Sequence, residues 1–177
     1  MTGVPHPRQN YYFAVQTNYV DVGRTLASVL NQLTDTGIGK LKIGQKAIEL
    51  MTEFNIKSMP VKGEYSLKYT IQGFNRLYAF CSVGLLPPDG EVTYIRIEFN
   101  AAMTPNYELF QDNMSNAITS YLDELGLEKV DGGEDIDFYL SPQRTYDVVN
   151  FKNKGVILLM SKFMMNKMHG LYNETFN

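Results

Sequence analysis

The most regular pattern of hydrophobic and polar positions lies in the middle of the chain. Residues 63–72 (GEYSLKYTIQ) alternate strictly between apolar and polar side chains, which is typical of a strand with one buried face. Residues 76–86 (RLYAFCSVGLL) are apolar on both faces and predict an internal strand. The Pro-Pro-Asp-Gly sequence at 87–90 predicts a turn, and residues 91–100 alternate again. The three segments together predict an antiparallel meander.

Three other segments have apolar residues at helical spacing, every third or fourth position. One runs from Asp21, a plausible N-cap, to Leu33, and a second spans Ile43 to Phe54. The third begins at Thr104-Pro105, an N-cap followed by proline in the first helical position, and ends before Gly126. Each predicts an amphipathic helix with one face against the core.

The last third of the chain returns to strand patterns. Residues 136–140 and 145–151 predict strands, and Asn-Lys-Gly at 153–155 predicts a hairpin turn. The segment that follows, 156–163, predicts a strand, although its apolar residues also keep helical spacing. We therefore expect a strand first and allow a helix from about Ser161.

These elements predict a single α+β domain: an antiparallel sheet packed against about three amphipathic helices. Residues 1–10 hold two prolines and predict an extended N-terminal arm. Residues 11–17 (YYFAVQT) are a candidate strand, so the domain is expected to span residues 11–177. No repeat or linker divides it.

Composition supports a globular protein of ordinary type, with 177 residues, 44% hydrophobic and 20% charged. No apolar run reaches the roughly 18 residues of a membrane span, and the N-terminus lacks the apolar core of a signal peptide. Cys81 is the only cysteine, which excludes an internal disulfide. It lies in an apolar run and is expected in the core, in a reducing, cytoplasmic compartment.

Charge is distributed unevenly along the chain. Residues 1–80 hold nine basic and five acidic residues (+4), residues 81–147 hold three and thirteen (−10), and residues 148–177 hold four and one (+3). Faces of opposite sign can attract copies of the same molecule, and chance segregation is the alternative. The residues expected to carry such a contact are Lys162 and Lys167 on one side and Glu134 and Asp135 on the other.

Tests for catalytic patterns are negative. Asp35-Thr-Gly matches the aspartic protease triplet, but it follows an amphipathic helix and has no second copy, so a helix–helix connection is the better reading. Asp89 and Glu98 resemble a metal-dependent nuclease pair, yet Asn100 stands where a lysine is needed. The acidic loop 131–137 fails calcium-loop spacing. We expect no enzymatic activity, no metal and no cofactor.

Aromatic residues on the predicted strands raise a different possibility. A sheet with exposed rings and cations can stack single-stranded bases, and the candidate contacts are Tyr65, Lys68, Tyr69, Arg76 and Tyr78. Because the two tyrosines of the first strand share their face with Leu67 and Ile71, that face is better read as core. Nucleic-acid binding is an alternative that we do not favour.

The segment SKFMMNKMHG at 161–170 is the strongest interaction signal. Phe163, Met164, Met165 and Met168 form an adaptable apolar stripe suited to a partner, and packing against the domain explains the stripe equally well.

We expect a non-enzymatic assembly or structural protein that acts through protein–protein contacts. Its partners would be other protein subunits, in a homo-oligomer or larger assembly, with no membrane association. The composition suggests a viral component, such as a virion completion or ring protein, in the cytoplasm or in a virion assembled there. The alternatives are a single-stranded nucleic-acid-binding protein and a metal-dependent hydrolase built on carboxylates.

Overall fold

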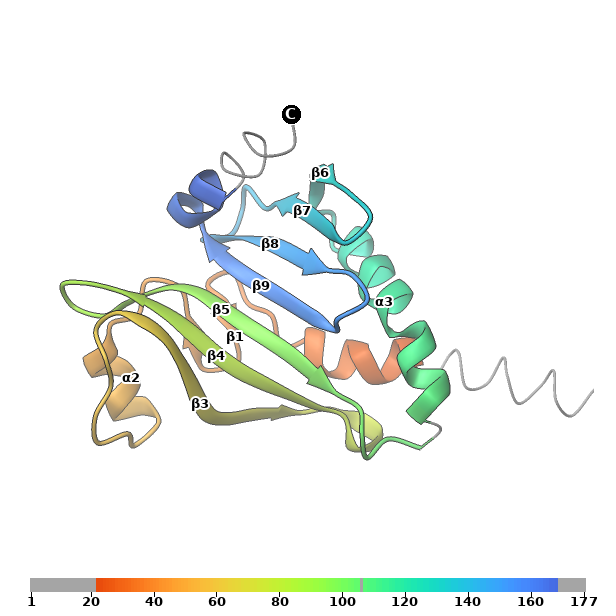
Figure 1. The fold of residues 1–177 in the computed structure, drawn as a ribbon, viewed down its shortest axis with the longest axis horizontal. Coiled ribbons are helices and arrows are strands. Elements are labelled where there is room, and N and C mark those ends of the chain that lie inside the picture. The colour runs from red at the N-terminus through yellow and green to blue at the C-terminus, as the bar shows by residue number, and fades with distance from the viewer. Residues whose placement is uncertain (1–21, 106, 169–177) are drawn as a thin grey trace, which may run out of the picture.

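A seven-stranded antiparallel sheet forms the centre of the molecule, which the computed structural model describes for residues 22–105 and 107–168 (Figure 1). The strand order is β3-β4-β5-β9-β8-β7-β6. The strands are β3 (Gly63–Gln72), β4 (Tyr78–Leu86), β5 (Glu91–Asn100), β6 (Glu128–Gly132), β7 (Ile136–Leu140), β8 (Tyr146–Phe151) and β9 (Val156–Ser161). With the helices below, they make the single α+β domain that the sequence predicts.

The predicted meander is confirmed by the pairing of β3, β4 and β5. Tyr65 lies opposite Val83, and Val83 lies opposite Ile95, so apolar residues align across three strands. β4 is internal, as its two apolar faces indicate. The register with β4 shifts at one place, where β3 has two extra residues between Ser66 and Thr70; the alternation of exposed and buried side chains continues through this bulge.

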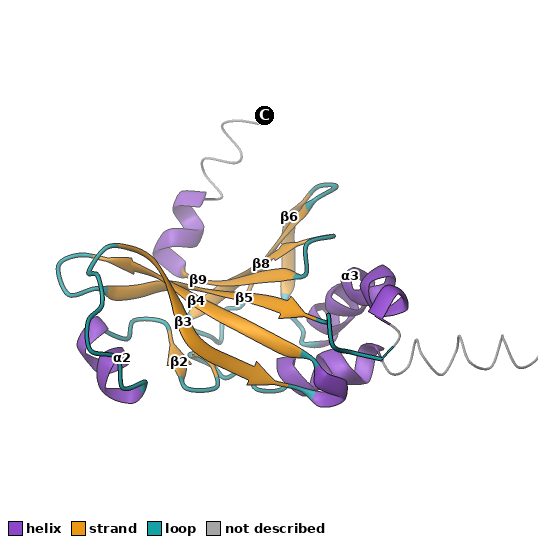
Figure 2. Cartoon of the chain, turned by 60° about the horizontal axis from the view of Figure 1, so that its bottom comes forward, coloured by secondary structure: helices purple, strands orange, loops and turns teal. Residues whose placement is uncertain are grey.

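Three helices cover one face of the sheet, as Figure 2 shows. They are residues 22–30, α2 (Ala47–Glu53) and α3 (Tyr107–Glu124). α3 buries the face predicted from its spacing, and its four buried residues share one core cluster with β9 and with both neighbours of β4. Cys81 is 1% exposed in this cluster, so the expectation of a core cysteine is confirmed.

The opposite face of the sheet carries a smaller apolar cluster. It is formed by strands β7, β8 and β9 together with a short helix at residues 162–168, and its buried members are Phe138, Val149, Val156, Leu158, Met160 and Met165. This helix follows β9 directly, so the segment after residue 155 is a strand first and a helix second, as expected. Figure 2 shows it standing on the side of the sheet away from α2 and α3.

Three details differ from the sequence prediction. The second helix is shorter than the span 43–54, because the chain enters it through backbone bonds between Gly44, Gln45 and Val92. Residues 128–132 form a strand, β6, although their burial shows no alternation. A two-stranded hairpin, β1 (Gly37–Ile38) and β2 (Leu41–Lys42), lies within the connection after the first helix. The predicted arm at 1–10, the candidate strand at 11–17 and the Asp21 cap lie outside the described residues.

The strands define two ends of the sheet, which we name end A and end B. End A contains the β3–β4 turn, the β8–β9 turn, the β6–β7 turn and the start of α3, at the right of Figure 1. End B contains the β4–β5 turn, α2 and the helix at 162–168, at the left of the same view. A side chain that points away from either end is available to a neighbouring molecule.

Candidate interaction site

Asp35 has a structural position in the connection between the first two helices. Its backbone carbonyl accepts a hydrogen bond from the Thr145 amide at 2.9 Å, and its side chain is exposed. The preceding Thr34 hydroxyl accepts the Thr36 and Gly37 amides at 3.3 and 3.0 Å, which closes the turn. The Asp-Thr-Gly sequence therefore forms a turn that ties this connection to β8.

The two carboxylates of the nuclease-like pattern lie far apart. Asp89 is in the β4–β5 turn at end B, where it pairs with Lys46 at 3.2 Å, and Glu98 pairs with Arg96 at 2.6 Å. Seven residues of extended strand separate Glu91 from Glu98, which corresponds to roughly 23 Å. Among the described residues, no group of three or more His, Cys, Asp or Glu side chains is placed to hold a metal ion.

One carboxylate of the acidic segment is buried. Asp137, only 1% exposed, receives the ammonium groups of Lys129 and Lys152 at 3.1 and 3.2 Å on the same oxygen, Oδ1. These ion pairs, together with the Lys152 amide bonded to the Asp135 carbonyl at 2.8 Å, fasten the β6–β7 turn to β8. The two predicted contact residues Glu134 and Asp135 are exposed in that turn, and neither forms an ion pair within residues 22–105 and 107–168.

The predicted nucleic-acid contacts do not share one surface. Tyr65 and Tyr69 are half-buried on the helix-covered face and pack against the main core. This position agrees with the sequence pattern, in which they share one face of the strand with Leu67 and Ile71. Tyr78 lies on the opposite face. Arg76 is exposed in the β3–β4 turn and Lys68 is exposed on β3. Instead of forming a stacking platform, the first two tyrosines and Lys68 line a pocket, described below.

The open part of the sheet, over β3, β4 and β5, presents polar side chains that are already bonded. Glu64 accepts hydrogen bonds from the Tyr94 hydroxyl at 2.8 Å and from the Ser82 hydroxyl at 3.2 Å. Burial and this carboxylate raise the pKa of Tyr94 to about 12. With Arg96 neutralised by Glu98, the surface offers little net positive charge to a phosphate backbone. Phe80, whose side chain is 45% exposed, is an apolar ring on this otherwise polar surface.

The apolar stripe of the C-terminal helix divides into two parts. Met165 is 2% exposed and belongs to the second apolar cluster, and Met168 packs against its border. Met164 is half-buried, and Phe163 is 59% exposed. The ammonium of Lys167 lies 4.7 Å from the centre of the Phe163 ring, a cation–π contact at the surface. Core packing accounts for Met165, and the outer side of the helix remains available to a partner.

Lys162 is engaged within its own chain. Its ammonium donates hydrogen bonds to Asp147 Oδ1, to the Ser141 carbonyl at 2.7 Å and to the Tyr146 carbonyl at 3.4 Å. The Asp147 side chain is 4% exposed, so this pair stabilises the junction of β7, β8 and the helix. Of the two lysines predicted to attract a neighbour, Lys167 is the one that forms no ion pair within the described part of the chain.

Large exposed apolar side chains gather at the two ends of the sheet. At end A, Phe74 is 61%, Met103 63% and Tyr107 45% exposed. At end B, Ile48 is 66%, Val61 49% and Phe163 59% exposed. The remaining two among the described residues are Phe80, on the open sheet face, and Val130, on β6. Where such side chains form a contiguous patch, they mark a surface that contacts other molecules.

The backbone at end A is held in a strained shape that displays Phe74. Asn75 and Arg76 both have positive φ, 54° and 63°, a conformation that costs side chains such as these about 1 kcal/mol or more. The first helix stabilises it: the Ser28 hydroxyl accepts the Phe74 amide at 2.8 Å, and the Asn75 amide group donates to Thr25 at 2.8 Å. These two hydrogen bonds fix the turn, and the Phe74 ring is exposed on it.

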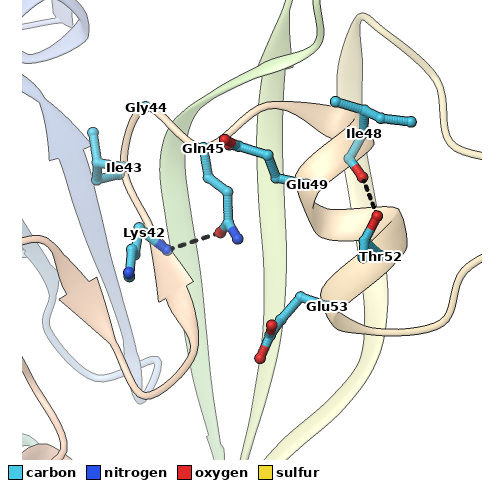
Figure 3. A pocket seen from close by; sticks show the side chains of 8 residues that line it. All are labelled: Lys42, Ile43, Gly44, Gln45, Ile48, Glu49, Thr52 and Glu53. Carbon is cyan, nitrogen blue, oxygen red and sulfur yellow. Dashed lines mark hydrogen bonds between the residues drawn. The ribbon is translucent and has the colours of Figure 1, made fainter.

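End B contains a surface cleft of about 590 Å³ between the segment 42–45 and α2 (Figure 3). Its polar groups are largely occupied. Gln45 accepts the Lys42 amide at 3.2 Å, Glu49 accepts the Lys46 amide at 2.8 Å, and Glu53 pairs with Lys40 at 3.7 Å. The cleft is therefore a surface for shape contact rather than a reactive site.

No protein-family model matches this chain, and searches of curated proteins and of solved structures found no match. Within the described residues, no helix has the length and apolar character required to cross a membrane.

The sequence analysis did not identify Phe74, Met103 and Ile48 as candidate contact residues, because a single apolar residue in a loop or on a polar helix face has no periodic signal. The available indication was a proline-rich or glycine-rich turn that contains one large apolar residue.

Proposed function

We propose that this chain is a non-enzymatic assembly protein that self-associates head to tail, with end A of one copy against end B of the next. The observation that carries the proposal is that, of the eight large exposed apolar side chains in the described part of the chain, six lie at the two opposite ends of the sheet. A contact between two different surfaces of the same molecule is heterologous, and its repetition gives a ring or a filament.

The distribution of charge supports the same arrangement. Glu134 and Asp135 lie in the β6–β7 turn at end A, and Lys167 lies on the helix at end B. If a copy is shifted along the strands without rotation, apolar Phe74 approaches the α2 side of its neighbour while the acidic turn approaches the C-terminal helix (Figure 1). Exposed ion pairs contribute only about 0.2–1 kcal/mol each, so apolar contact would supply most of the affinity and charge would guide association.

Sedimentation velocity over a range of protein and salt concentrations tests the proposal. We expect species larger than the 20.1 kDa chain, with an association rate that falls as salt rises, because screening beyond about 8–10 Å removes the guidance. A Phe163→Ser variant should dissociate these species. The matched control is Val130→Ser, which removes an exposed valine from β6, away from both ends. Equal loss with both variants, or a monomer at all concentrations, would refute the proposal.

Charge reversal gives a second test. Lys167→Glu should weaken association, and Glu134→Lys with Asp135→Lys in the same chain should restore part of it. Lys162 is left unchanged, because its bond to the buried Asp147 makes its replacement a test of folding. The viral component and the cytoplasmic location suggested by composition stay predictions, which localisation of the tagged protein would test.

A further inference from the structure

A pocket of about 360 Å³ lies beneath β3, between that strand and the segment that follows α2. It borders α2 of end B but includes none of the exposed apolar residues of either end, and its binding does not depend on the proposed assembly. Its lining residues are Phe54, Asn55, Ile56, Lys57, Tyr65, Leu67, Lys68 and Tyr69. Its volume is at the lower limit of the range of about 300–1,000 Å³ for small-molecule sites, which favours a small ligand over a polymer.

The pocket combines an aromatic wall with fixed geometry. The rings of Phe54 and Tyr69 lie 4.9 Å apart, centroid to centroid, tilted by 57°. The Tyr69 hydroxyl fills the space beside Gly39, where a Cβ atom would come within 2.5 Å of it, and Gly39 itself has φ +54°. Any other residue at position 39 would strain the backbone and displace the tyrosine. Tyr65 adds a third ring, half-buried, and Leu67 an apolar side chain that is 5% exposed.

A lysine side chain accompanies the rings. Lys57 and Lys68 both border the pocket and both are exposed, but Lys68 alternates with Leu67 and Tyr69 along β3, so its side chain leaves the strand on the other face. Lys57 forms no ion pair among the residues that the structure describes, in contrast to Lys40, Lys46 and Lys129. No carboxylate contributes to the lining. An unpaired lysine beside an aromatic wall is complementary to a ligand that has a planar ring and a negative group.

We propose that this pocket binds a small aromatic anion, a molecule that combines one planar ring system with a phosphate, carboxylate or sulfonate group. The ring would contact Phe54, Tyr65 and Tyr69 in tilted or edge-to-face geometry. The anionic group would receive the ammonium group of Lys57.

Two probes test the site: 8-anilinonaphthalene-1-sulfonate, whose fluorescence rises in apolar surroundings, and adenosine monophosphate as its competitor. We expect saturable binding of the first at one site per chain and displacement by the second. Adenosine, which keeps the ring and lacks the phosphate, should displace the probe at least fivefold less well. Lys57→Gln should weaken binding about three- to fivefold, whereas Lys68→Gln, on the other face of β3, should leave it unchanged.

The matched control is Lys154→Gln, on the β8–β9 turn at end A, which should leave probe affinity unchanged. A Phe163→Ser chain separates this pocket from the assembly surface, since it should bind the probe normally while association is lost. Circular dichroism of each variant confirms that it is folded. Probe binding that is unchanged in Lys57→Gln, or equal displacement by adenosine and its monophosphate, would overturn the proposal. Tighter binding of a single-stranded oligonucleotide than of the mononucleotide would overturn it in favour of a nucleic-acid site.

Discussion

Replacement of Lys162 by methionine is predicted to destabilise the fold by about 2–4 kcal/mol. The substitution keeps the length of the side chain and removes the ammonium that bonds Asp147, the Ser141 carbonyl and the Tyr146 carbonyl. Asp147 is 3% exposed and would keep one other hydrogen bond, which it accepts from the Ser141 amide at 2.8 Å. The prediction therefore concerns an uncompensated charge beneath the C-terminal helix.

The magnitude follows from the burial of the two partners. Removal of one member of a buried ion pair costs about 3–5 kcal/mol, and a buried carbonyl left without a donor adds about 1–3 kcal/mol. The Lys162 side chain is 43% exposed, so water already screens part of the attraction, and we place the net loss at about 2–4 kcal/mol. Asp147→Asn in the same chain removes the unpaired charge and should recover at least half of this loss.

Urea unfolding followed by circular dichroism measures the effect, with urea chosen because it adds no ionic screening. All variants are compared at one protein concentration, since assembly would otherwise shift the midpoint. Lys154→Met, which removes an exposed lysine with no ion pair among the described residues, is the control and should change stability by less than about 0.5 kcal/mol. If Lys162→Met unfolds at the same urea concentration as the control, the assignment of Lys162 to an internal bond is wrong.

Three further predictions address burial. Because burial raises the pKa of Cys81 to about 12, a thiol reagent at pH 8 should leave the native protein unlabelled and react fully in denaturant; rapid native labelling would contradict this. Burial likewise raises the pKa of Tyr146 and of Tyr94, where the Glu64 carboxylate adds to it, to about 12. The folded state thus keeps protons that the unfolded chain loses, so stability should fall between pH 10 and 12, by up to about 1.4 kcal/mol per pH unit for the buried Tyr146 and by less for Tyr94, which solvent screens; a flat profile there would argue against it. Met165→Ala should cost about 2–4 kcal/mol, whereas Phe163→Ala should cost less than about 0.5 kcal/mol; similar costs in urea titrations would refute the division of the C-terminal helix.

β3 and β5 could be predicted because one face of each is buried, which gives their sequences an alternation of apolar and polar residues, and β4 could be predicted from its continuous apolar run. The same holds for α3, whose buried residues fall on one stripe. β6 could not, since it lies at the edge of the sheet with its residues largely exposed, and edge strands have no need of alternation. Its formation depends on pairing with β7, which a local pattern does not record.

The candidate site was harder to predict for the same reason. Charge counts along the chain give Lys162 and Lys167 the same predicted role as contact residues. Only the fold shows that the buried carboxylate of Asp147 lies beside Lys162. Conversely, the exposed position of Phe74 depends on two hydrogen bonds that join its turn to the first helix, 46 and 50 residues earlier in the chain. Contacts of that separation are set by tertiary packing, and the sequence pattern contains no trace of them.

The most direct test of head-to-tail assembly uses two variants, each with one damaged end. One carries Phe74→Ser and Met103→Ser at end A, and the other carries Ile48→Ser and Phe163→Ser at end B. Each keeps one intact end, so a mixture can form a single interface and no more. Sedimentation velocity should show each variant alone as a 20.1 kDa monomer and an equimolar mixture as a species of roughly twice that mass. If either variant assembles alone, or if the mixture remains monomeric, the two ends are not partners and the account is wrong.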